Sequence, residues 1–79
     1  MSKSTEYEVY YAVSGATQFW EYPHQRISNG IIISNLPSEN TDSLRVVLAD
    51  IRHRVENKGW IPKFTRMNKS AMKVTWKER

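Results

Sequence analysis

The chain has 79 residues, no cysteine and a formal net charge of +4 at neutral pH. A chain of this length forms one domain and buries only about 60 to 65% of the surface that it exposes when unfolded. Without cysteine it has neither disulfides nor a thiolate metal site. Its longest apolar run, Ile31 to Ile33, is far shorter than the roughly 20 residues of a membrane-spanning helix. We therefore expect one small domain, residues 1–79, in the cytoplasm and without membrane association.

The charge is unevenly distributed along the chain. Residues 1–44 contain two basic and five acidic side chains, whereas residues 45–79 contain ten basic and three acidic ones. A basic C-terminal half favours an anionic partner, either nucleic acid or an acidic protein surface.

Residues 6–13, EYEVYYAV, alternate with a period of two. In a strand, Tyr7, Val9, Tyr11 and Val13 would point one way and the residues between them the other. The pattern predicts a half-buried strand.

Residues 14–29 form a long loop in this interpretation, with large rings at Phe19, Trp20 and Tyr22. Such a loop either covers the core or contacts a partner, and alternation would place Phe19 inward and the other two rings outward. The β-branched run at residues 30–35 predicts a well-buried strand. Asn29-Gly30 is a turn signal that would also pair residues 24–28 with that strand.

Residues 41–58 predict an amphipathic helix. Its apolar residues follow the i, i+3, i+4, i+7 spacing: Leu44, Val47, Leu48, Ile51 and Val55. Asn40 or Thr41 is expected to cap its start. Gly59 supplies a left-handed cap at its end, and Pro62 prevents the helix from continuing.

Residues 61–67 and 71–77 predict a hairpin. A three-residue loop would pair Phe64 with Val74 and Met67 with Ala71, which keeps the apolar side chains on one face. The face toward the helix would contain Phe64, Met72, Val74 and Trp76. The outer face would contain Lys63, Thr65, Lys73, Thr75 and Lys77.

These elements predict an α+β domain of ββαββ order, in which one amphipathic helix covers one face of an antiparallel sheet of about four strands. With the first strand beside the third, in the order 2-1-3-4, the crossover is right-handed and Glu6 and Glu8 fall on the lysine-bearing face. The strand at 30–35 would then be an edge, and the chain a monomer or a dimer formed through that edge.

The residues capable of catalysis or metal binding do not form a recognisable constellation. His24 and His53 are the two histidines, and neither lies at a spacing typical of a zinc site or a nucleophile–base pair. Gly15, Gly30 and Gly59 are isolated rather than arranged as a phosphate-binding loop. We expect no enzyme activity, no cofactor and no metal.

Two surfaces are candidate binding sites. The loop supplies Trp20, Tyr22 and Arg26, and Trp and Tyr are enriched at the centres of protein interfaces. The hairpin supplies a basic set that would hold nucleic acid or an acidic surface: Lys63, Lys69, Lys73 and Lys77. Exposed lysines also serve to prevent edge pairing, and single-strand binding needs exposed rings, whereas Phe64 and Trp76 are predicted to face the helix. We therefore prefer a protein partner.

The order of elements, the size, the lack of cysteine and the closing strand IPKFTR at residues 61–66 resemble small phage-encoded proteins that block a host machine. Anti-CRISPR proteins and inhibitors of host RNA polymerase are of this kind. The resemblance lies in the layout, and it implies a protein that works by occupying a site on a larger partner. We predict a non-enzymatic binding protein, such as an inhibitor encoded by a phage or mobile element, with a nucleic-acid-binding domain as the alternative.

Overall fold

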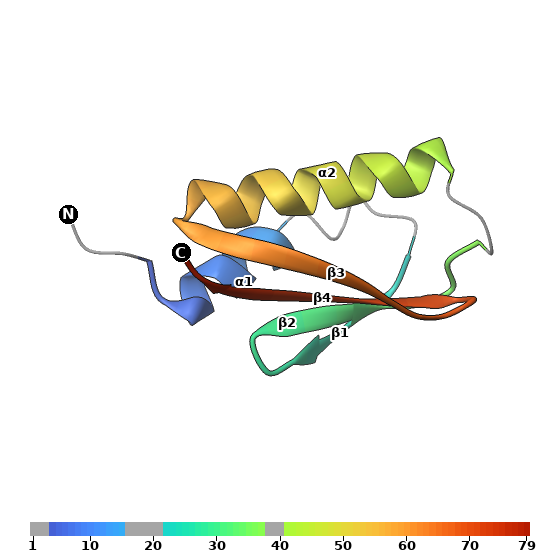
Figure 1. The fold of residues 1–79 in the computed structure, drawn as a ribbon, viewed down its shortest axis with the longest axis horizontal. Coiled ribbons are helices and arrows are strands. Elements are labelled where there is room, and N and C mark those ends of the chain that lie inside the picture. The colour runs from blue at the N-terminus through green and yellow to red at the C-terminus, as the bar shows by residue number, and fades with distance from the viewer. Residues whose placement is uncertain (1–3, 16–21, 38–40) are drawn as a thin grey trace.

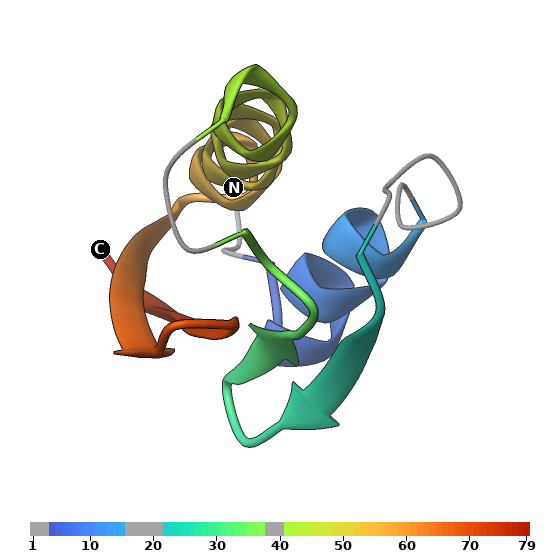
Figure 2. The ribbon, with the colours of Figure 1, turned by 90° about the vertical axis from the view of Figure 1, so that its right-hand side faces the viewer.

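The structure is a computed structural model that describes residues 4–15, 22–37 and 41–79. Its elements in chain order are α1 (Glu6–Ser14), β1 (His24–Ile27), β2 (Gly30–Ile33), α2 (Asp42–Asn57), β3 (Trp60–Asn68) and β4 (Ala71–Glu78). Both helices lie on the same side of one curved sheet (Figure 1). Figure 2 shows α2 above β3, and α1 on the side of β1 and β2.

The sheet is four-stranded, with antiparallel pairings and the order β1-β2-β4-β3. The predicted α+β class is confirmed. The order ββαββ recurs in β1-β2-α2-β3-β4, but its first strand is residues 24–27 and not the predicted 6–13, which form the helix α1. The predicted strand order is wrong, because the residues taken as the first strand form α1. The prediction of an edge at residues 30–35 is also wrong, because β2 pairs with both β1 and β4.

Residues 6–14 form a helix because a capping box starts it. Thr5 Oγ1 accepts a hydrogen bond from the Glu8 backbone N–H (3.2 Å), and the Glu8 carboxylate accepts one from the Thr5 N–H (2.7 Å). Val9 and Val13, one turn apart, are fully buried. In a strand these valines would share a face with Tyr7, whereas helical geometry turns that ring outward.

The helix α2 confirms the predicted helix at 41–58. Thr41 Oγ1 accepts a hydrogen bond from the Leu44 N–H (3.2 Å) at its start, and Gly59 has the left-handed φ of 83° after its end. Its buried face consists of Leu44, Val47, Ile51 and Val55. Leu48 is partly buried beside that face.

The β3–β4 hairpin has the predicted pairing of Phe64 with Val74. The predicted face toward the helices is confirmed: Met72, Val74 and Trp76 are buried, and Phe64 packs partly buried against the core. The predicted pairing of Met67 with Ala71 is wrong, because Asn68 takes that place and a bulge lies between Arg66 and Asn68. The bulge accommodates within β3 the extra residue that the three-residue loop was expected to hold.

The turn signal before β2 is also confirmed. β1 pairs with β2 from His24 to Ile27, and Asn29 takes the left-handed φ of 54° in the turn between them.

Among the described residues no helix is long and apolar enough to cross a membrane.

The close approach of β2 to β4 depends on Gly30. A Cβ atom at this position would lie 2.2 Å from the Val74 carbonyl oxygen, which belongs to the backbone of the neighbouring strand. We expect Gly30→Ala to separate the two strands and lower the free energy of unfolding by about 2 kcal/mol or more, measured by urea denaturation. Gly15→Ala is the control, because Gly15 has the right-handed φ of −62° at an exposed helix end. Equal stability of the two variants would contradict this view of the sheet.

Candidate functional site

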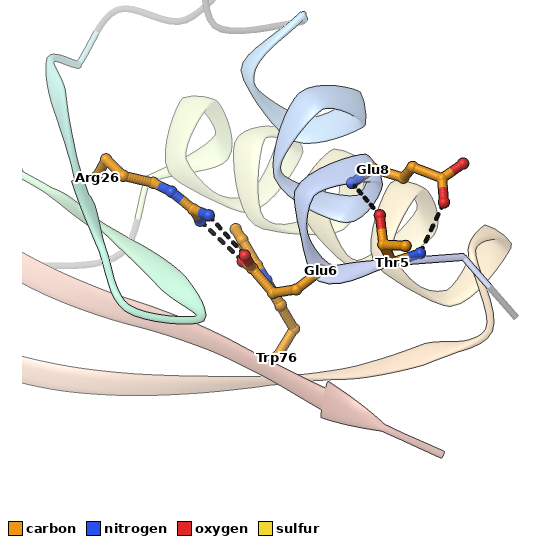
Figure 3. A network of polar contacts seen from close by, with 5 residues as sticks. All are labelled: Thr5, Glu6, Glu8, Arg26 and Trp76. Carbon is orange, nitrogen blue, oxygen red and sulfur yellow. Dashed lines mark hydrogen bonds and ion pairs between the residues drawn. The ribbon is translucent and has the colours of Figure 1, made fainter.

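The first turn of α1 is joined to the sheet by the Glu6 carboxylate (Figure 3). Arg26 of β1 donates to both carboxylate oxygens, from Nη1 at 2.8 Å and Nη2 at 2.6 Å. The indole Nε1–H of Trp76 in β4 donates to the same carboxylate at 2.6 Å. Glu6 therefore connects the helix with two strands of the sheet.

Hydrogen bonds from Arg26 lower the pKa of Glu6, and the Trp76 bond adds to this effect, while partial burial opposes it. The same ion pair raises the pKa of Arg26, whose guanidinium also lies 4.0 Å from the centre of the Tyr10 ring. The prediction that Glu6 lies on the lysine-bearing face is thus wrong. Glu6 and Glu8 both belong to α1, which lies on the other side of the sheet, together with α2 (Figure 2).

Two further hydrogen bonds hold the ends of α1. The indole Nε1–H of Trp60 donates to the Ser4 carbonyl at 2.8 Å, just before the helix starts. Near the helix end, Arg54 of α2 donates to the Ala12 carbonyl at 3.2 Å, and Asp50 holds the same guanidinium at 3.0 Å. The helix α1 is therefore fixed in orientation as well as in position.

The outward side of α1 presents two adjacent rings, Tyr7 and Tyr11, each 65% exposed. Their ring centres are 6.0 Å apart, at an interplanar angle of 42°. They line an open hollow of about 330 Å³ together with Glu8, Ala12 and Lys58. We call Tyr7, Tyr11 and this hollow the tyrosine face.

The tyrosine face contains two charged side chains, Glu8 and Lys58. Hydrogen bonds from the Thr5 backbone N–H and side chain lower the pKa of Glu8, so this carboxylate is ionised at neutral pH and cannot act as a general acid there. In the part of the chain that the structure describes, no three His, Asp or Glu side chains cluster as a metal site would require.

Of the predicted loop residues that would contact a partner, the structure describes Tyr22 and Arg26. Trp20 and Phe19 lie outside the described residues. Tyr22 packs partly buried against the core, so the prediction that this ring lies outside is wrong. The Arg26 side chain is engaged by Glu6 within the chain, and its predicted role toward a partner stays a prediction.

The hairpin lysines lie where the sequence predicted. Alternation along the strands directs three lysines away from the helices: Lys63, Lys73 and Lys77. Their neighbours Phe64, Val74 and Trp76 point toward the helices. Within the four strands, all of whose residues are described, no acidic side chain occupies an outward position. Lys69 lies in the exposed turn between β3 and β4. We call Lys63, Lys73 and Lys77 the lysine face.

Sequence reasoning missed the tyrosine face because it read residues 6–13 as a strand. One local signal identifies the helix: Thr5 and Glu8 have the spacing of a capping box before the apolar valines. Comparison with known proteins finds no matching family model, no matching curated protein and no matching solved structure.

The Glu6 contacts make the stability of the domain depend on pH. Because the folded-state pKa of Glu6 lies below its ordinary value of 4.5, its stabilisation is present above that pH and is lost as the pH falls through the folded-state value. We expect Glu6→Gln to lower the free energy of unfolding by about 1 to 2 kcal/mol at pH 7, and this deficit to shrink toward pH 3.

Thermal unfolding of the two proteins between pH 7 and pH 3 measures the effect. The exposed Glu56→Gln of α2 removes the same charge away from the network and serves as the control. A Glu6→Gln deficit that stays constant across this range would show that the carboxylate is not specifically paired.

Proposed function

We propose that the protein is a non-enzymatic domain that binds a larger protein in the cytoplasm and acts by occupying a site on it. The observation that carries the proposal is the tyrosine face, where two large rings lie exposed side by side on a helix that is held at both ends. The absence of cysteine fits a reducing compartment.

Tyrosine side chains are suited to such a contact for a physical reason. Each ring buries a large area on binding and has few rotatable bonds to immobilise, so the loss of conformational entropy is small. The anchoring of α1 through Glu6 and Trp60 means that the helix itself does not have to be ordered on binding. The hollow beside the rings offers space for a side chain of the partner.

The resemblance of the layout to phage-encoded inhibitors also indicates what kind of partner to expect. It suggests a host protein or nucleoprotein whose working surface is covered when the small domain binds. Inhibition is then steric and needs no reaction at the interface.

Replacing the two rings tests this function. We expect Tyr7→Gln with Tyr11→Gln to weaken partner binding by about 30-fold or more, as for an interface hot spot, while the free energy of unfolding changes by less than about 0.5 kcal/mol. The measurement is quantitative capture from a lysate of the host cells, followed by titration of the captured partner. Val46→Gln, which replaces an exposed apolar side chain on α2, is the matched control.

Two results would contradict the proposal. In the first, the double variant captures the same proteins as the wild type with the same affinity. In the second, it unfolds much more easily, which would assign the rings to the core.

A nucleic-acid-binding domain is the second candidate, and the lysine face favours it. Three lysines share a surface that bears no acidic strand residue. The rings expected to stack with bases are not on that surface, since Trp76 is only 2% exposed and faces the helices. Contacts would therefore go to phosphates alone.

A gel-shift titration at several salt concentrations tests this candidate. Three phosphate contacts with duplex DNA predict a slope of about −3 for log K against log salt, and replacement of Lys63, Lys73 and Lys77 by Gln would abolish binding. Absence of binding to DNA and RNA at low salt would eliminate it.

A further inference from the structure

We propose that the groove between α2 and the edge strand β3 binds an extended segment of a partner protein as an additional strand of the sheet, and that the side chains of this segment that face the groove are a central apolar residue flanked by acidic ones. The inference rests on the proposed function only in requiring a protein ligand. It uses none of the residues of the tyrosine face.

The strand β3 has one free backbone edge. It lies at the end of the sheet and pairs with β4 alone. The Trp76 backbone N–H donates to the Asn29 carbonyl on the β2 side at 2.9 Å, so the backbone groups of Trp76 point away from β3. Pro62 and Phe64, which lie opposite Trp76 and Val74, therefore direct their backbone polar groups outward.

The outward groups include both a donor and acceptors. Phe64 presents an N–H and a carbonyl, and Pro62 presents a carbonyl without an N–H. Among the described residues, no backbone hydrogen bond from outside the hairpin reaches either of them. These groups form the hydrogen-bonding pattern that an added strand recognises.

The groove beside this edge has an apolar floor. An open hollow of about 360 Å³ is lined by Arg45, Leu48, Ala49 and Arg52 of α2 and by Phe64 of β3. The four helix residues follow the i, i+3, i+4, i+7 spacing and so form one stripe, next to the buried one. Leu48 and Phe64 are partly buried against the core and supply the large apolar side chains of the groove lining.

The dimensions of the groove match a short strand. From Arg45 to Arg52 the helix rises about 10 Å at 1.5 Å per residue. An extended segment of three or four residues covers this length at about 3.3 Å per residue. Every second side chain of such a segment would point into the groove and the others away from it.

The basic side chains around the groove favour an acidic ligand. Arg45 and Arg52 lie at the ends of the stripe, and no ion pair among the described residues involves either of them. Arg52 lies 5.4 Å from the centre of the Phe64 ring, so its guanidinium lies beside the apolar lining of the groove. Lys63 projects from the opposite face of the same strand. A second copy of β3 would bring like charges together, so an acidic partner is favoured over self-pairing.

A synthetic peptide tests this site with the full-length protein. The probe is a fluorescent eight-residue peptide whose groove-facing side chains are Glu, Val and Glu in turn, with Thr at the positions between them. We expect saturable binding by fluorescence anisotropy, and slower hydrogen exchange at the Phe64 amide when the peptide is bound. The Arg45→Gln, Arg52→Gln double variant should bind at least about tenfold more weakly.

Two controls distinguish strand addition at β3 from nonspecific charge attraction and from binding at the tyrosine face. A peptide N-methylated on the amides that face β3 should not bind, because it cannot make the backbone hydrogen bonds. The Tyr7→Gln, Tyr11→Gln variant should bind the peptide normally, so failure of the proposed function and failure of this inference give different results.

Several outcomes would overturn the inference. They are no binding at about 1 mM peptide, equal binding of the N-methylated peptide, and binding that leaves exchange at Phe64 unchanged. Concentration-dependent dimerisation that protects the Phe64 amide in the absence of peptide would assign the edge to a second copy instead.

Discussion

The arrangement of this domain depends on the buried indole of Trp76 and its hydrogen bond to Glu6. A buried indole N–H requires an acceptor, and here the acceptor is a carboxylate that Arg26 also holds. Glu6 lies in the first turn of α1, where the helix dipole also favours a negative charge. The contact brings the first helix over the sheet and places both helices on one face.

The consequence of this arrangement is that the remaining surfaces are distinct and separately oriented. One sheet face is covered, which leaves the lysine face open on the other. The tyrosine face lies on the outer side of α1, and the groove of α2 lies at the β3 edge. The hollows beside the tyrosine face and beside β3 are both open ones, so binding would use these outer surfaces.

The sequence predicted those helices, turns and strand pairings that depend on interactions between residues close together in the chain. The spacing in α2, the turn at Asn29 and the pairing of Phe64 with Val74 all follow from neighbouring residues, and so does the direction of the hairpin lysines. The helix α1 was not predicted, because apolar residues in EYEVYYAV recur with the period of two that is typical of a strand. Its partners Arg26 and Trp76 are distant in sequence. The tyrosine face depends on this helix, and the α2–β3 groove depends on strand order, so neither was predicted.

The most direct test of the docked first helix is the nuclear Overhauser effect between the Trp76 indole Nε1–H and the side-chain protons of Glu6. We predict a clear cross-peak at neutral pH and slow exchange of the indole protons of both Trp76 and Trp60, because α1 covers them. Fast exchange of these protons, without contact to Glu6, would show that the first helix is not docked on the sheet. The tyrosine face would then have no fixed support.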